Sequence, residues 1–201
     1  MRQRNGGKPV SIIYLTGMPA TGKSSVTSII AQRSTDIEIV RYSDVLKEYL
    51  KKTDGIDYTI QNLREKSSHI VSPAHIASLD DLVVQQIEES TANHVILESH
   101  AVTVEKYGYR ATPFSEDTLK RLHPDLILVL YDKPVSLQSR ILSDAQGRQP
   151  QDADAIAYGQ SLQASLALQY SVLLGSEICF LDVSKGPDYI AQWILDKLYS
   201  S

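Results

Sequence analysis

The 201 residues of the chain suit a single domain, 1–201, with room for a substantial core. The formal net charge is −4 and the Lys and Arg residues are scattered, which argues against a grip on the phosphate backbone of nucleic acid. One cysteine excludes a disulfide within the chain, and no stretch approaches the ~20 apolar residues that cross a bilayer. We therefore expect a cytoplasmic protein with no nucleic-acid partner and no membrane partner.

The first expected elements are a strand at residues 10–15 and a helix at 25–32, after a basic segment, 1–8, that we expect to be a flexible tail. The loop between them matches G-x-x-x-x-G-K-[ST], in which backbone N–H groups face phosphates, a lysine reaches the outer ones and a hydroxyl meets Mg²⁺. A glycine-rich turn could merely join a strand to a helix, but chance supplies these four positions in roughly one chain of this length in a hundred. We therefore expect a nucleotide to be held by Gly17, Pro19, Ala20, Thr21, Gly22, Lys23, Ser24 and Ser25.

A second strand is expected at residues 37–41, followed by helices at 43–51, at 59–70 and from Pro73 onward. Asp44 follows the second strand, and two interpretations of it remain open. An acid in the first turn of a helix is favoured by the helix dipole, or the carboxylate positions a second substrate.

The third strand, 95–97, runs directly into Glu98, Ser99 and His100. A carboxylate at this end of a strand beside the phosphate loop lies where such folds hold a metal or its waters, so Ser24 and Glu98 are the candidate Mg²⁺ ligands. Glu98 could instead face solvent, and His100 could be either a structural donor or a substrate contact. No second ligand stands at zinc spacing.

The remaining chain is expected to form strands at 126–130 and 178–181 and helices at 134–142, 154–174 and from Pro187 onward. Helical and strand patterns alternate throughout, which is typical of an α/β fold with a mainly parallel sheet. The continuous apolar strands predict five strands covered on both faces, with Cys179 as a buried, inert thiol.

Four arginines are candidates for phosphate chemistry, although each could be a solvated surface residue. Arg64 and Arg110 flank the third strand and together could clamp an accepting phosphate bidentately. Arg140 lies on a helix and Arg148 in the polar link that follows it, so both could neutralise charge on a moving phosphoryl group, while closure of the link would exclude water. With Lys23, these two arginines form the predicted catalytic set.

Several segments, taken in order, resemble archaeal-type adenylate kinases, within the wider family of P-loop nucleoside monophosphate kinases. The similar segments are 17–24 (GMPATGKS, for G-x-P-G-x-G-K-[ST]), 42–45 (YSDV, for Y-G-D-V), 98–101 (ESHA, for D-T-H-A), 108–109 (GY), 124–129 (PDLILV, for P-D-x-I-x-V) and 167–175 (A-x-x-Y-x-x-x-x-G). The departures are Ala20 and Ser43 for glycines, Glu98 for an aspartate, and a link in which Arg148 is the only arginine.

The resemblance implies a three-layer P-loop NTPase fold, a five-stranded parallel sheet flanked by helices, a helical acceptor-binding region at 42–92 and a short lid at 143–152. It also implies Mg·ATP as the donor and a possible homo-oligomer. The acceptor pocket would involve Asp44, Arg64, His100, Tyr109 and Arg110.

The first hypothesis is therefore phosphoryl transfer from ATP to a nucleoside monophosphate, with AMP or dAMP as the first guess. The alternatives are a kinase for a small alcohol, in which Asp44 accepts the hydroxyl proton, and a nucleotide-binding switch that regulates a partner.

Overall fold

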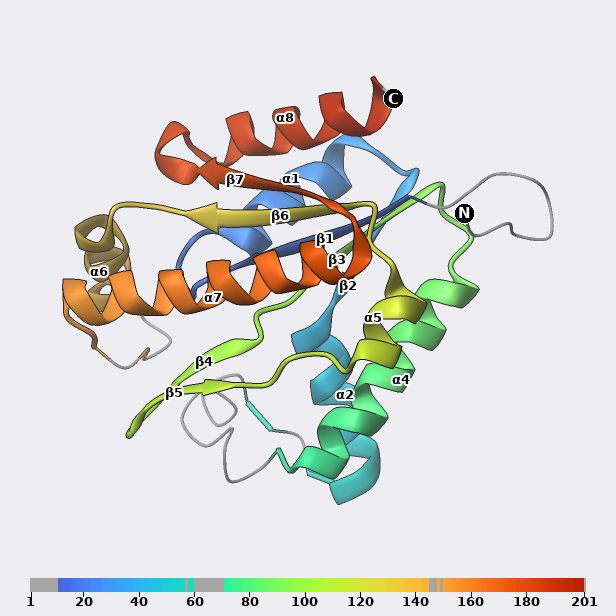
Figure 1. Cartoon of the computed structure of the whole chain (residues 1–201), viewed down its shortest axis with the longest axis horizontal. Coiled ribbons are helices and arrows are strands. Elements are labelled where there is room, and N and C mark those ends of the chain that lie inside the picture. The colour runs from blue at the N-terminus through green and yellow to red at the C-terminus, as the bar shows by residue number, and fades with distance from the viewer. Residues whose placement is uncertain (1–10, 57, 60–70, 145–147, 149, 201) are drawn as a thin grey trace.

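Five parallel strands form the central sheet of the computed structural model, which describes residues 11–56, 58–59, 71–144, 148 and 150–200 (Figure 1). The strand order is β2-β3-β1-β6-β7, and every neighbouring pair is parallel. This arrangement confirms the predicted sheet. The strands are β1 (Ser11–Gly17), β2 (Ile37–Arg41), β3 (His94–Glu98), β6 (Leu126–Tyr131) and β7 (Glu177–Asp182).

Helices cover both faces of the sheet, which gives the predicted three layers (Figure 1). Alternate strand residues point to opposite faces. Ile13 and Leu15 belong to the core under α1 (Lys23–Arg33) and α8 (Pro187–Tyr199), whereas Ile12 and Tyr14 belong to the core on the other face. The helices that pack on that other face are α4 (Pro73–Glu89), α5 (Glu116–Leu122) and α7 (Ala153–Leu174).

Two further helices lie beyond the carboxyl ends of the strands. α2 (Tyr42–Asp54) is joined to α4 by the Tyr42 hydroxyl, which donates to Asp80 Oδ1 over 2.7 Å. Burial raises the pKa of the Asp80 carboxyl to about 6. α6 (Pro134–Leu142) packs against α7 through a small apolar cluster that also contacts Ala20 of the phosphate loop.

Two strands and one α-helix of the described residues were missed by the sequence analysis. They are the antiparallel hairpin of β4 (Val102–Glu105) and β5 (Gly108–Ala111) and the helix α5. Strands of four residues and a helix of seven give little periodic signal, and the hairpin mixes small, polar and aromatic residues. Of the expected helix at 59–70, residues 60–70 lie outside the described residues, as does the tail at 1–8.

The expectation that every strand is buried on both faces is wrong for β7. This strand forms the edge of the sheet and has a single neighbour, β6. The Phe180 side chain is 43% exposed and Cys179 is only half-buried, so the predicted buried thiol is also wrong. A short 3-10 turn, η1 (Val183–Lys185), then leads into α8. None of the helices in the described ranges has the length and apolar character needed to cross a bilayer.

We expect Leu128→Ala to lower the free energy of unfolding by about 2–5 kcal/mol, because Leu128 is fully buried in the central sheet and its loss leaves a cavity. The matched control is Leu173→Ala on α7, whose side chain is 61% exposed and which should cost no more than about 0.5–1 kcal/mol. Urea denaturation followed by circular dichroism measures both. Equal losses would contradict the placement of the core.

Candidate active site

The loop between β1 and α1 lies where the carboxyl ends of β1, β3 and β6 meet. Gly17 is required there, because a Cβ at this position would lie 2.6 Å from the carbonyl oxygen of Leu130. Ala20 has a φ of 70°, the left-handed conformation that favours glycine, at the position where the resembled kinases carry one. The methyl group costs about 1 kcal/mol in this conformation. The departure seen in the sequence is therefore a strained residue in the loop.

Lys23 is buried beneath the loop and folds back onto it. Its ammonium donates to the carbonyl oxygens of Gly17, over 2.7 Å, and Met18, over 3.3 Å. Burial lowers the pKa of Lys23 to about 8; the negative charge of Glu98 opposes this fall, and the positive charge of Arg148 adds to it. The ammonium has three N–H donors, so one of them remains for another acceptor.

A carboxylate and two hydroxyls meet beside the first turn of α1. Ser24 Oγ donates to Glu98 Oε1 over 2.7 Å, and Thr27 Oγ1 donates to Glu98 Oε2 over 2.9 Å. Within the described ranges no group of three or more His, Cys, Asp and Glu side chains could hold a metal ion. One hydroxyl and one carboxylate nevertheless suit Mg²⁺, which keeps several waters and takes further oxygen ligands from phosphates. The donor set therefore fits a magnesium ion brought in with a nucleotide.

Arg41 is a member of this cluster that the sequence analysis did not single out. It ends β2 directly opposite Glu98 in the register of the sheet. Its Nε lies 3.3 Å from Glu98 Oε2, and its Nη2 donates to Thr27 Oγ1 over 3.1 Å. The guanidinium thus compensates the buried charge of Glu98. The sequence did carry one indication of this contact: Arg41 and Glu98 each come at the end of an apolar run that was expected to form a strand of the parallel sheet.

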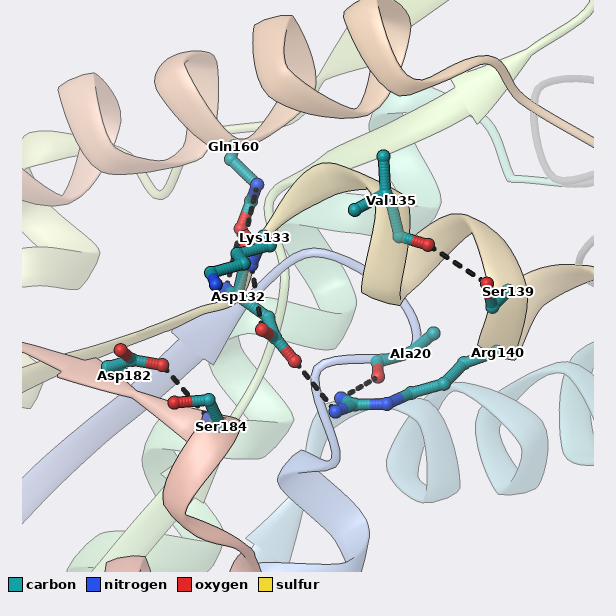
Figure 2. Close-up of polar contacts among 9 residues, drawn as sticks. All are labelled: Ala20, Asp132, Lys133, Val135, Ser139, Arg140, Gln160, Asp182 and Ser184. Carbon is teal, nitrogen blue, oxygen red and sulfur yellow. Dashed lines mark hydrogen bonds and ion pairs between the residues drawn. The ribbon is translucent and has the colours of Figure 1, made fainter.

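Arg140 reaches the phosphate loop from α6 (Figure 2). Its Nη2 lies 2.7 Å from Asp132 Oδ2, and its Nη1 donates to the carbonyl oxygen of Ala20 over 3.4 Å. Asp132 follows β6 and is buried, with 1% of its side chain exposed. Gln160 of α7 holds the backbone of Asp132. Neither Asp132 nor Gln160 was predicted, because their roles depend on contacts between distant segments.

Arg148 also lies on the phosphate-loop side of the molecule. It forms an ion pair with Asp144, Nη1 to Oδ2, over 3.0 Å, and its charge contributes to the lowered pKa of Lys23. Residues 145–147 and 149 of the predicted lid lie outside the described residues. The structure therefore brings the three predicted catalytic residues, Lys23, Arg140 and Arg148, to one region, while their roles remain predictions.

The residues predicted to bind the acceptor are spread over several elements. Asp44 is exposed in the first turn of α2, and His100 is exposed just after β3. Arg110 donates from Nη2 to the carbonyl oxygen of Val71, just before α4, over 3.0 Å. Arg64 lies outside the described residues. Their acceptor-binding role remains a prediction.

Tyr109, whose predicted contact with the acceptor remains a prediction, joins the β4–β5 hairpin to α7 in this structure. Its hydroxyl donates to the carbonyl oxygen of Ala155. Its ring packs against Tyr158 and against Gly159, the glycine that Met18 also approaches. Any direct role toward an acceptor would add to this structural one.

The comparison with protein families assigns the chain to one of them. A family model described as AAA domain matches residues 16–157, which include the phosphate loop, Glu98, Arg140 and Arg148. The chain belongs to this AAA domain family.

Curated relatives of this AAA-domain chain include archaeal adenylate kinases. It is 28% identical to the adenylate kinase of Pyrobaculum aerophilum over 129 residues, which span 64% of this chain and only 62% of that one. It is 24% identical to the adenylate kinase of Pyrococcus abyssi over 166 residues, 80% of each chain. The resemblance seen in the sequence motifs is therefore confirmed.

Solved structures with the same fold include shikimate kinase from Acinetobacter baumannii in complex with shikimate. It has a TM-score of 0.59, 15% sequence identity, and a match over 96% of this chain and 95% of that one. Shikimate kinase from Bacteroides thetaiotaomicron gives a TM-score of 0.57 at 15% identity, over 95% of this chain and 99% of that one. At these identities the match establishes the P-loop α/β fold alone.

We expect the affinity for ATP to fall as the pH rises above 8. Without a nucleotide, the Lys23 ammonium loses its proton near this pH, because its pKa is about 8. Bound phosphates favour the protonated lysine, so the protein must take up a proton when it binds ATP above pH 8. The dissociation constant should rise by up to about tenfold per pH unit, measured by calorimetry at fixed Mg²⁺. Lys23→Arg keeps its charge at these pH values and should lose the dependence; parallel slopes in the two proteins would contradict this.

Proposed function

We propose that the chain transfers the γ-phosphoryl group of Mg·ATP to a nucleoside monophosphate, with AMP or dAMP as the first candidates. The observation that carries the proposal is the grouping of Lys23, the Ser24–Glu98 pair and Arg140 around one phosphate loop. The similarity to archaeal adenylate kinases supports the choice of acceptor class.

The donor half of the mechanism follows from the phosphate loop. Lys23 would exchange the carbonyls of Gly17 and Met18 for the β- and γ-phosphates, as the unpaired N–H groups at the start of α1 face the same anion. Ser24 and Glu98 would hold Mg²⁺ directly or through its waters, displacing their mutual hydrogen bond. The ion would neutralise charge on the β- and γ-oxygens.

The chemical step needs positioning and charge neutralisation more than it needs a base. An oxygen of the acceptor phosphate forms a bond to the γ-phosphorus, while the bond from that phosphorus to the β,γ-bridging oxygen breaks, and ADP leaves with the electron pair. An ionised phosphate oxygen has no proton to lose. Arg140, held in place by its ion pair with Asp132, and Arg148, after loosening its ion pair with Asp144, would offset the charge that spreads over the moving group.

A second candidate is transfer to a small hydroxylated metabolite, which the position of Asp44 favours. This carboxylate is exposed in the first turn of α2, beyond the end of β2 and on the same edge of the sheet as the phosphate loop. A hydroxyl acceptor must lose a proton, and an exposed carboxylate could receive it. Asp44→Asn would then abolish transfer to the alcohol.

The test is a coupled assay of ADP formation with Mg·ATP and each natural ribo- and deoxyribonucleoside monophosphate, beside a panel of small hydroxylated metabolites. We expect turnover with a monophosphate, and loss of at least about a thousandfold in Lys23→Ala, because the charge on the transferring phosphates is no longer offset. Lys120→Ala on α5, with its side chain 64% exposed, is the matched control and should retain the wild-type rate. ADP formation only with the metabolites, or equal activity in Lys23→Ala, would refute the proposal.

A further inference from the structure

Gln160 forms two hydrogen bonds with a single residue far away in the chain. Its Oε1 accepts from the N–H of Asp132 over 3.1 Å, and its Nε2 donates to the C=O of Asp132 over 3.0 Å. Asp132 lies one residue beyond the end of β6, past the last β1–β6 partners, Gly17 and Leu130. The side-chain amide thus takes the place of a neighbouring strand and pairs with both the N–H and the C=O of Asp132.

The side chain of Asp132 continues this contact toward the phosphate loop (Figure 2). Its Oδ1 accepts from the N–H of Lys133 over 2.7 Å, and its Oδ2 faces Arg140 Nη2 over 2.7 Å. Both carboxylate oxygens are therefore occupied, and the carboxylate is buried. A buried charge held on every side cannot reorient without losing its partners, so the position of Asp132 determines where it offers its charge to Arg140.

Arg140 is the outward member of this chain of contacts. Its side chain is 44% exposed, yet it also reaches the carbonyl oxygen of Ala20 in the phosphate loop. An exposed arginine otherwise samples many rotamers, and ordering it costs free energy when a ligand binds. The pair with Asp132 removes much of that freedom in advance.

Gln160 lies in the first half of α7. α7 begins at Ala153 with Asp152 as its N-cap, so Gln160 lies about two turns from the end of the segment that holds Arg148. A displacement of this end of α7 would move the amide of Gln160, and with it Asp132 and the guanidinium.

We propose that Gln160 is a positioning residue, which acts through Asp132 to hold Arg140 over the phosphate loop. The inference rests on the proposed phosphoryl transfer for its effect on rate. Its effect on ATP binding stands independently.

The experiment is a double-mutant cycle. Gln160→Met keeps the length of the side chain and removes both hydrogen bonds, and Arg140→Met removes the guanidinium. We expect Gln160→Met to weaken ATP binding by about threefold to tenfold and to lower kcat by about tenfold, with KM for the monophosphate changed by less than about twofold. In the Arg140→Met background it should change none of these values further. Gln169→Met, an exposed glutamine on the same helix, is the matched control and should behave as wild type.

A second variant supplies a readout that loss of packing alone would not give. Gln160→Glu places a carboxylate oxygen against the carbonyl of Asp132, but its protonated form again has one donor and one acceptor. The ratio of its kcat and ATP affinity to those of wild type should rise as the pH falls from about 8 to about 5.5. A ratio independent of pH would contradict the role of the two hydrogen bonds.

The outcomes separate this inference from the proposed function. Three results would each overturn the inference. The first is that Gln160→Met weakens ATP binding by the same factor in wild type and in Arg140→Met. The others are that Gln160→Met has no effect, or that Arg140→Met does not change ATP binding. If wild type transfers phosphate to no monophosphate, the proposed function fails, and the binding cycle still decides the role of Gln160.

Discussion

The carboxylate of Glu98 is the charge around which the functional edge of the sheet is arranged. It ends β3, is nearly buried, and is in contact with two hydroxyls of α1 and with Arg41 of β2. An uncompensated buried carboxylate would be costly, so these contacts hold β2, β3 and the start of α1 in one register. The same oxygens can serve a hard cation when it arrives with a nucleotide. The Glu98 carboxylate can thus either pair with Arg41 or bind a metal ion.

The second organising element is α7, which contacts several of the segments around the site. Gln163, fully buried, donates to Thr16 of β1 over 2.8 Å and accepts from the N–H of Val102 in β4 over 3.2 Å. Gly159 lets Met18 and Tyr109 approach the helix closely. One helix therefore connects the strand and loop that lead into α1 with the β4–β5 hairpin. A shift of α7 would therefore reach both of these segments together.

Much of the fold could be predicted from the sequence, because it depends on local patterns. Apolar runs gave the five strands, helical spacing gave the long helices, and the spacing of Gly17, Gly22 and Lys23 identified the phosphate loop. The β4–β5 hairpin lacked such a pattern. Arg41, Asp132 and Gln160 escaped for a different reason: each matters through partners distant in the chain, and no spacing rule connects Gln160 with Asp132. Ala20 was recognised as a departure, but only its backbone conformation showed that it is strained.

The central claim is that Glu98 serves the metal of a bound nucleotide. It is tested most directly by measuring ATP affinity by calorimetry with and without Mg²⁺ in wild type and in Glu98→Gln, with folding checked by thermal unfolding. Our account predicts that Mg²⁺ tightens binding to wild type by about tenfold or more, and that Glu98→Gln loses most of this gain while it binds metal-free ATP at least as well. An unchanged Mg²⁺ effect in a folded Glu98→Gln protein would contradict it.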